Sequence, residues 1–417
     1  MRILRLTHDV EKRLLQARQG SNRDAERVAV RIAGDVRRNG DAALLRWTKK
    51  LDGVDLKRKG MWISQRELRV AERQVSTDFL RAVRHAARNI RRVAERQLPR
   101  AWTLEVEPGV RIRQMVRPIE SIGCYVPGGR FALVSTLLMT VAPAQVAGVD
   151  RIVAVCPKPN PALLAAANLL GVREIARIGG AQAIAALAYG TKLVPRVEKL
   201  FGPGNRFVTA AKQIVSRDCA IDLPAGPTEA LVLAEHGNPR WIAADLLAQA
   251  EHAPDAGSFL ITTSRELARH VAAEIDSQLR ALPVGNPAHA SAKSSGAILI
   301  AASLEAACEF VNRFAPEHLS LPSSASSLLS KVRASGTVFL GPWAAQPLGD
   351  YVSGSNHVLP TGGWARRRGG LSAGDFVKCI TVQDISRAGF LRLAAAAESL
   401  AVAENLLAHH NAVTVRR

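Results

Sequence analysis

Short apolar runs alternate with helix-like segments in the middle of the chain, and this order restricts the fold more than any other feature. Apolar runs at residues 151–155 and 174–178 are followed by helix-like segments at 162–170 and 182–189. Two parallel strands can be joined only by a connection of about a dozen residues or more, usually a helix that covers one face of the sheet. The βαβα order therefore predicts a parallel sheet covered on both faces.

The same alternation returns in the second half of the chain. Because both halves share it, we predict an α/β chain with two incomplete, doubly wound Rossmann-like units. Further strands are expected at 230–234, 259–262, 297–300 and 337–340, and further helices at 241–252 and 304–314.

Helical regions are expected at both ends. Residues 1 to about 105 are rich in Arg, Glu, Gln and Ala with helical spacing. Residues 391–410 also have helical spacing after a loop at about 352–375, so this tail could pack on a second subunit. The expected parts are a helical N-terminal region (1–115) that packs partly on the α/β core, a first α/β domain (116–235), a second α/β domain (236–375) and a C-terminal tail (376–417).

Composition excludes several classes of protein. With 47% hydrophobic and 22% charged residues, the chain has the composition of a folded globular protein. Five cysteines without a CxxC pair suggest neither a disulfide framework nor a thiolate zinc site, which fits a reducing compartment. The first residues carry charges throughout, unlike a signal peptide, and polar residues interrupt the apolar stretch 132–149. We therefore expect a buried helix there, no membrane span and a cytoplasmic location.

The formal net charge of +20 raises a hypothesis of nucleic-acid binding. Arginines are dense between Arg81 and Arg96, but apolar residues recur among them at helical spacing. These arginines therefore form either the solvated face of an amphipathic helix or an anion-binding surface. Because no RNP motif, zinc finger or basic-aromatic array accompanies them, we do not expect nucleic acid as the main partner.

Two glycine-containing turns could approach a cofactor, although no GxGxxG fingerprint follows a strand. The run Leu200-Phe-Gly-Pro-Gly-Asn205 leads into a helix-like stretch at 206–215, whose first amides could attract phosphate. An ordinary tight turn is the other interpretation. The same two interpretations apply to residues 125–129, where Tyr125 stands at the mouth of a Pro-Gly-Gly turn.

Two short constellations could carry chemistry. Gln249 and His252 lie three apart within the predicted helix 241–252, so they could bind one divalent ion such as zinc or simply end a surface helix. Glu317 and His318 follow a predicted helix on a proline turn, and they could serve two proton transfers or act as a cap and a structural histidine. Further metal ligands could come from Asp350, His357, His409 or His410.

Taken in order, these segments resemble the histidinol dehydrogenase family, over most of the chain beyond about residue 115. Each block alone would prove little, but their shared order makes chance agreement a poor explanation. The blocks are CYVPGG (124–129), STLLMTVAPAQVAGV (135–149), GGAQAIAALAYGT (179–191), GPGN (202–205), AGPTEALVLAE (225–235), DLLAQAEH (245–252), FAPEHL (314–319), GDYVSGSNHVLPTGG (349–363) and AENLLAHHNAV (403–413).

The resemblance implies an enzyme that oxidises L-histidinol to L-histidine in two NAD-dependent steps, the last steps of histidine biosynthesis, through a retained aldehyde. It also implies one zinc ion per subunit that binds the substrate. By the same resemblance His318 would take the alcohol proton, and Glu317 would activate water for the second step. The implied zinc ligands are Gln249, His252, Asp350 and His409. The implied substrate contacts are these four together with Thr228, His318 and Glu404. The implied NAD contacts are Tyr125, Gln182 and Asn205.

In this family the terminal helix comes from the partner subunit, so the resemblance implies a homodimer that completes each site. Glu404 and His409, five positions apart, would lie on that helix, with Glu404 facing the substrate ammonium group. His357 and His410 would have no metal duty.

Some positions depart from the family pattern. Thr228 stands where the family often has Ser, Arg206 follows GPGN, and arginines 366–368 make a loop unusually basic. An alternative is therefore a same-family dehydrogenase for another primary alcohol, such as a sulfonated propanediol. Glu404 favours an ammonium-bearing substrate and keeps histidinol ahead. A cysteine nucleophile would be a competing route to aldehyde oxidation, and only Cys124 neighbours a proposed cofactor segment.

Overall fold

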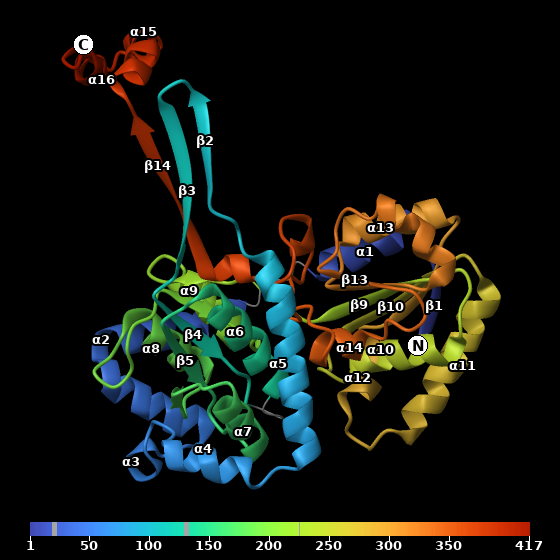
Figure 1. Cartoon of the computed structure of the whole chain (residues 1–417). Helices are drawn as coiled ribbons and strands as arrows, with labels where there is room; N and C mark the ends of the chain where they lie inside the picture. Colours follow the sequence, from blue (N-terminus) through green and yellow to red (C-terminus); the bar gives the residue numbers. More distant parts are fainter. Residues whose placement is uncertain (19–22, 129–132, 225) are drawn as a thin grey trace.

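A computed structural model describes residues 1–18, 23–128, 133–224 and 226–417. It has two α/β lobes side by side and a long arm that projects from the first lobe (Figure 1). Three predicted segments, 124–129, 132–149 and 225–235, each have one end outside the described residues. These end residues are Gly129, Ala132 and Ala225.

The first lobe contains a five-stranded parallel sheet in the order β6-β5-β4-β7-β8. The predicted βαβα segment lies here as β5, α7, β6 and α8, and α6 is the expected buried helix. The strands are β4 (Ser121–Tyr125), β5 (Arg151–Val155), β6 (Glu174–Ala176), β7 (Lys199–Phe201) and β8 (Ala220–Ile221), and the helices between them are α6 (Val134–Ala147), α7 (Pro161–Leu169), α8 (Gly180–Tyr189) and α9 (Arg206–Val215).

Helices from the N-terminal region complete the two layers around this sheet. One core contains buried residues of α2 (Arg23–Asp52), α8 and α9, and the other contains those of α4 (Gln65–Glu72), α5 (Thr77–Gln97), α6 and α7. The sheet is therefore covered on both faces, as predicted. The short helix α3 is Leu56–Lys59.

Helix α5 carries the arginine-dense segment. Its apolar positions, including Val83, Ala87 and Ile90, are buried, whereas Arg84, Arg88 and most of the other arginines are exposed. The segment therefore forms the solvated face of an amphipathic helix, one of the two predicted alternatives.

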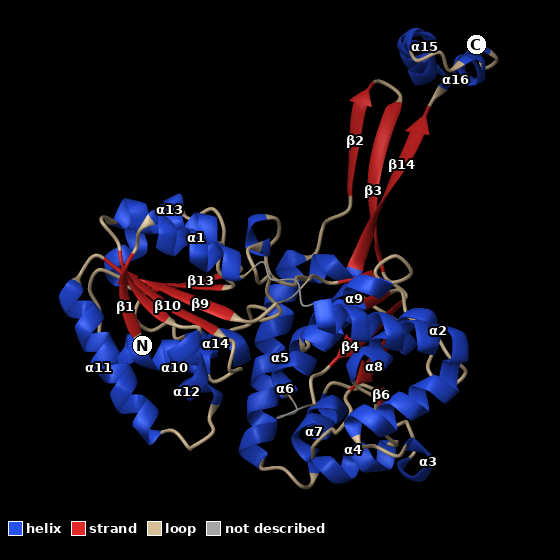
Figure 2. Ribbon diagram, turned by 180° about the vertical axis from the view of Figure 1, so that it is seen from behind, coloured by secondary structure: helices blue, strands red, loops and turns tan. Residues whose placement is uncertain are grey.

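The second lobe contains a six-stranded parallel sheet in the order β1-β11-β10-β9-β12-β13, with helices on both faces (Figure 2). Helices α1 and α13 pack with one core, and α10 and α11 with the other. The strands are β1 (Arg2–Arg5), β9 (Glu229–Leu233), β10 (Gly257–Thr262), β11 (Ala297–Ile300), β12 (His318–Leu321) and β13 (Thr337–Leu340), and the helices are α1 (His8–Ala17), α10 (Pro239–Ala250), α11 (Arg265–Ala281), α12 (Pro287–Ser294), α13 (Leu304–Phe314) and α14 (Gln346–Tyr351).

The arm is a three-stranded antiparallel ribbon that carries two helices at its tip (Figure 1). It joins β2 (Trp102–Glu107) and β3 (Val110–Pro118) to β14 (Val377–Ile385), which comes more than 250 residues later. Helices α15 (Arg387–Ala403) and α16 (Leu407–Thr414) form the tip. Three short 3-10 helices lie at Ser323–Lys331, Trp364–Arg366 and Ala373–Phe376.

Two details differ from the sequence-based expectation. The tail is not a single helix over 391–410, because Asn405 has a left-handed φ of 57° and separates α15 from α16. The strands that were not predicted are β1, β2, β3, β4, β8, β12 and β14. Strand β1 belongs to the second lobe although it begins the chain. In the described ranges, no helix is both long and apolar enough to cross a membrane.

Candidate active site

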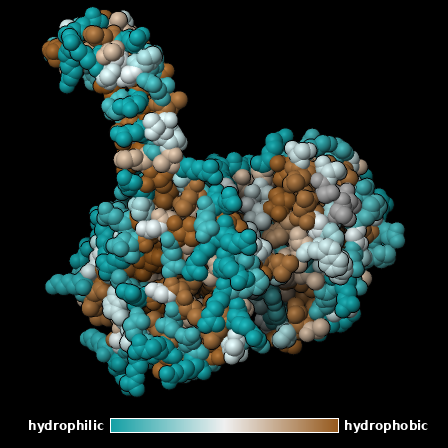
Figure 3. Space-filling view, viewed as in Figure 1, coloured by the Kyte–Doolittle hydropathy of each residue, from teal (hydrophilic) through white to brown (hydrophobic). Residues whose placement is uncertain are grey.

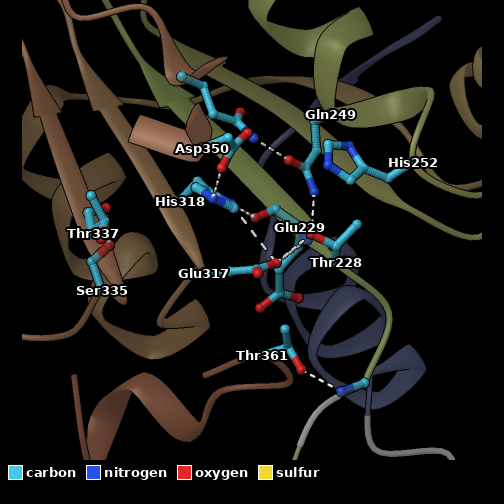
Figure 4. A network of polar contacts seen from close by, with 12 residues as sticks. Thr228, Glu229, Gln249, His252, Glu317, His318, Ser335, Thr337, Asp350 and Thr361 are labelled. Carbon is cyan, nitrogen blue, oxygen red and sulfur yellow. Dashed lines mark hydrogen bonds and ion pairs between the residues drawn. The ribbon is translucent and has the colours of Figure 1, made fainter. Parts of the chain in front are cut away.

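Most of the predicted chemistry gathers in the second lobe, at the amino ends of β9 and β12 (Figure 4). Thr228 directly precedes β9, and Glu317 directly precedes β12, whose first residue is His318. Strand β9 pairs with β12 in parallel, which brings the two strand starts together. The segment that enters β9 is also the connection from the first lobe, so the site lies where the chain passes between lobes.

Glu317 is a buried carboxylate held by two hydrogen bonds. Its Oε2 accepts from Thr228 Oγ1 at 2.5 Å and from the backbone N of Glu229 at 2.9 Å. Burial raises the pKa of Glu317 above its usual value, although neighbouring His318 and the hydrogen bonds oppose this shift. A carboxylate with a raised pKa can exchange a proton nearer neutrality.

His318 lies between two carboxylates. Its Nδ1 is 3.3 Å from the backbone oxygen of Glu229 and 3.8 Å from Glu317 Oε2. Its Nε2 is 3.5 Å from Asp350 Oδ1 and is a buried atom without a hydrogen-bond partner among the described residues. Burial lowers the pKa of His318, but Glu317 and Asp350 outweigh this effect and raise the pKa. The ring therefore offers one nitrogen, Nε2, for a proton from a bound molecule.

Gln249 continues the same network. It is fully buried, its Nε2 donates to Thr228 Oγ1 at 2.6 Å, and its Oε1 accepts a hydrogen bond from Gln346 Nε2. Helix α10 ends at Ala250, so His252 follows the helix and does not lie inside it as the sequence predicted. Figure 4 shows the His252 ring beside the Gln249 amide.

Asp350 comes from α14 and completes this side of the site. Burial raises the pKa of Asp350, but His318, His357 and His252 outweigh that effect and lower it, so the carboxylate stays ionised. His357 does not face the site with both nitrogens, because its Nδ1 lies 2.8 Å from the backbone oxygen of Asp350.

The side-chain donor atoms of Gln249, His252 and Asp350 are of kinds that can bind a metal ion. His252 Nδ1 lies 3.0 Å from the backbone oxygen of Ala248, an arrangement that fixes the ring and leaves Nε2 as the available donor atom. An amide oxygen, an imidazole and a carboxylate are acceptable zinc ligands. Within the described ranges, however, no group of three or more His, Cys, Asp and Glu side chains is arranged to hold a metal ion.

Glu404 and His409 do not lie with the other predicted site residues. Glu404 caps the C-terminal end of α15 and His409 lies in α16, so they are not on one helix. Both are exposed and line a hollow at the tip of the arm together with Leu400 and Leu406. Figure 1 shows the tip far out on the arm, away from the second lobe.

The predicted NAD contacts lie in the first lobe, at the carboxyl ends of its strands. Tyr125 ends β4, and its hydroxyl accepts from the backbone N of Gly180 at 3.2 Å. Asn205 caps α9 by accepting from the backbone N of Phe207 at 3.0 Å. Ligands of open α/β sheets bind at such strand ends.

Gln182 makes a buried hydrogen bond inside the first lobe. Its side chain is fully buried in α8, and its Nε2 donates to Asp52 Oδ2 at 2.9 Å. Burial is the largest influence on the pKa of Asp52, and it raises that pKa above its usual value. The pair thus braces the start of α8, and Asp52 was not predicted from the sequence.

A buried ion pair holds the GPGN turn. Lys212 Nζ donates to the backbone oxygen of Gly202 at 3.0 Å and pairs with Asp222, whose Oδ2 accepts from the Gly202 N at 2.8 Å. Gly202 has a φ of 110°, and a Cβ there would overlap the backbone oxygen of Tyr125. The GPGN turn and the Tyr125 turn are therefore packed directly on each other.

The Lys212→Met variant is expected to lose about 3–5 kcal/mol of stability, because it leaves Asp222 as an uncompensated buried charge. Melting temperature is the measurement. The matched control is Arg151→Ala, which breaks a pair with Glu174 that is 44% and 34% exposed, and which should cost less than about 1 kcal/mol. Equal melting temperatures for the two variants would contradict the role given to Lys212.

The described cysteines offer no nucleophile beside the site. Cys124 is fully buried in β4, and burial raises the pKa of its thiol to about 12, so it stays protonated. Cys379 is the exposed cysteine among them and lies on the arm strand β14. The cysteine route to aldehyde oxidation therefore gains no support.

Sequence reasoning missed the pair Arg18 and Glu229. Glu229 is buried and is the first residue of β9, directly after Thr228, and Arg18 follows α1. The two lie 211 positions apart. Glu229 belongs to the block at 225–235, but nothing in the sequence assigned it a role or paired it with Arg18.

Comparison with known proteins gives one consistent answer. A sequence model described as histidinol dehydrogenase matches residues 15–417. Histidinol dehydrogenase from Halalkalibacterium halodurans is 46% identical over 393 residues, which are 92% of each chain. The protein of that name from Aquifex aeolicus is 45% identical over 394 residues, covering 94% of this chain and 92% of the relative.

Solved structures agree with the sequence comparisons. The crystal structure of histidinol dehydrogenase from Elizabethkingia anophelis has a TM-score of 0.94 at 38% identity and covers 100% of this chain and 98% of that chain. A methylmalonate-semialdehyde dehydrogenase from Oceanimonas doudoroffii has a TM-score of 0.50 at 13% identity over 93% of each chain, which indicates a shared fold alone.

Proposed function

Because this chain belongs to the histidinol dehydrogenase family, we propose that it oxidises L-histidinol to L-histidine in two NAD-dependent steps through an aldehyde that stays bound. The chain is an enzyme of the dehydrogenase type, and histidine biosynthesis is the corresponding pathway. The observation that carries the proposal is the buried pair Glu317–His318 beside Gln249, His252 and Asp350 (Figure 4).

His318 is suited to the first oxidation. As a hydride passes from the alcohol carbon to NAD⁺, the hydroxyl group loses a proton, and His318 Nε2, a buried atom 3.5 Å from Asp350 Oδ1, is placed to accept it. The two carboxylates beside the ring stabilise the imidazolium that forms. The products of this step are the aldehyde, NADH and a proton held on His318.

Glu317 is suited to the second oxidation. The aldehyde must add water before a second hydride can leave, and a carboxylate with a raised pKa can take the proton from that water. Thr228 and the backbone of Glu229 fix one carboxylate oxygen, so the other is available. The second hydride again goes to NAD⁺, and the product is the carboxylic acid.

Gln249 Oε1, His252 Nε2 and the carboxylate of Asp350 would hold a zinc ion, with His409 of the partner subunit as the fourth ligand. A zinc ion bound there would orient the substrate and lower the pKa of its hydroxyl group. Gln249 would release its contact with Gln346 to do so, and Thr228 would then keep the amide in register through its 2.6 Å hydrogen bond. Tyr125, Gln182 and Asn205 stay the predicted NAD contacts, with Gln182 acting from its buried position.

A homodimer would bring the arm tip of one chain to the site of the other. Apolar side chains are exposed along the arm and its tip (Figure 3), including Trp102, Leu104, Leu400 and Leu407. Such exposed apolar surface is typical of a protein contact. Glu404 of the partner subunit would then face the ammonium group of the substrate. A cytoplasmic location stays a prediction from the sequence.

Product stoichiometry tests the proposed function. Zinc-loaded enzyme with excess NAD⁺ is expected to form two NADH for each L-histidinol consumed, because both oxidations occur at one site. The same assay with a sulfonated propanediol tests the alternative substrate, which should give little or no NADH. No NADH from L-histidinol, or only one per molecule, would contradict the proposal.

A further inference from the structure

Arg18 joins two segments of the second lobe. Its Nε donates to Glu229 Oε2 at 2.7 Å and its Nη2 donates to Glu229 Oε1, so the guanidinium binds the carboxylate through two hydrogen bonds. Its Nη1 donates to the backbone oxygen of Phe314, and the guanidinium carbon lies 3.6 Å from the centroid of the Phe314 ring. One side chain therefore connects the start of β9 with the end of α13.

Glu229 in turn touches both proposed catalytic groups through its backbone. Its N–H donates to Glu317 Oε2 at 2.9 Å, and its carbonyl oxygen lies 3.3 Å from His318 Nδ1. These contacts set the direction in which the carboxylate and the imidazole point. A shift at the start of β9 would move both groups at once.

The other segment that Arg18 holds leads directly into the same pair. Ala315, two residues before Glu317, has a left-handed φ of 51°, which is costly for a residue other than glycine. Arg18 Nη2 lies 3.5 Å from the backbone oxygen of Ala315. The guanidinium thus supports a strained turn on one side of Glu317 and the strand start on the other.

The charge of Glu229 depends on Arg18 as well. The Glu229 side chain is only 4% exposed, and burial raises its pKa to about 7 even though Arg18 acts in the opposite direction. Without the guanidinium this carboxyl group would either take up a proton or remain as an unpaired buried charge near Glu317. Either change alters the surroundings of Glu317.

We propose that Arg18 is a positioning residue for Glu317 and His318 and that it acts through Glu229. The inference rests on the proposed function, in which this pair transfers the protons. Arg18 contacts neither member of the pair, so its loss should slow the chemical steps and change substrate binding much less.

The test compares Arg18→Ala with Arg313→Ala as a matched control. Arg313 of α13 pairs with Glu11 of α1, so it also ties these two helices together, but its contacts lie away from Glu229. Arg18→Ala is expected to lower kcat for L-histidinol about 10- to 100-fold with a much smaller change in KM, because small misplacements of catalytic groups have effects of this size. Arg313→Ala should keep wild-type kcat.

Two further measurements separate positioning from folding. Millimolar guanidinium chloride, but not sodium chloride, should restore part of the kcat of Arg18→Ala and leave Arg313→Ala unchanged. Arg18→Lys, which keeps the charge but not the two-pronged contact, should keep the wild-type melting temperature more closely than Arg18→Ala and still have a reduced kcat.

The outcomes are distinguishable. If wild-type enzyme oxidises L-histidinol and Arg18→Ala or Arg18→Lys turns over as fast as Arg313→Ala, the positioning role is wrong and the proposed function stands. If the kcat loss follows the loss of melting temperature and guanidinium restores nothing, Arg18 is a purely structural residue and the inference is wrong. If wild-type enzyme is itself inactive, the proposed function and this inference both fail.

Discussion

Replacing Glu317 by glutamine is expected to separate the two oxidations. The second oxidation needs a base that takes a proton from water, and an amide cannot do this, so its rate should fall by about 10²- to 10⁴-fold. The first oxidation should persist at a reduced rate, because His318 is still present to take the hydroxyl proton. NADH per L-histidinol should therefore drop from two towards one while the aldehyde accumulates on the enzyme.

The reciprocal variant and a control sharpen this prediction. His318→Asn should lose the first oxidation, yet oxidise added aldehyde faster than Glu317→Gln does. Glu251→Gln is the control, since Glu251 caps α10 beside the site but is exposed and contacts neither catalytic group. Equal losses of both oxidations in Glu317→Gln and His318→Asn would show that the two residues do not divide the work as proposed.

Replacing His409 by alanine is expected to remove the metal and nearly abolish turnover. A bound metal ion contributes several kcal/mol to the reaction, and about 4 kcal/mol corresponds to roughly 1,000-fold in rate. His410→Ala is the matched control on the same helix, and it should keep both zinc and activity. Zinc per chain, measured by elemental analysis beside kcat, checks both variants.

The proposed zinc ligands in the second lobe allow the same comparison. His252→Ala should lose zinc with the fold intact, because His252 is exposed at the end of α10 and supports no core. His357→Ala should keep zinc, since its Nδ1 faces the backbone of Asp350. Unchanged zinc content in His252→Ala and His409→Ala would place the metal elsewhere.

Local sequence patterns were enough to predict two parallel sheets, but not all of their strands: β4, β8 and β12 were missed. Strands such as β5 and β10 are continuous apolar runs, because helices cover both faces of a parallel sheet. Strand β1 is different, since it has only four residues and its partner β11 lies almost 300 positions away. The arm strand β2 alternates apolar and polar residues over Trp102–Glu107, but it was missed because residues 1 to about 105 were interpreted as helical, and the strand is exposed along its whole length.

The site could be predicted only in part for a related reason. The motifs that contain Gln249, Glu317 and Asp350 pointed to residues that the structure brings together in one network. The contact between Arg18 and Glu229 could not be predicted, because it depends on the tertiary packing of α1 in the second lobe. The exact end of α10 at Ala250 was also missed, and so was the break at Asn405 in the tail.

The central claim is that Gln249, His252 and Asp350 of one chain form a zinc site with His409 of the partner subunit. Dimers that combine one His252→Ala chain with one His409→Ala chain test it most directly. With shared sites, one site in each mixed dimer would carry both substitutions and the other would be intact, so about half of the wild-type zinc and kcat should return. If His409 served its own chain, each site would carry one defect, and mixed dimers as inactive as the parent variants would contradict the claim.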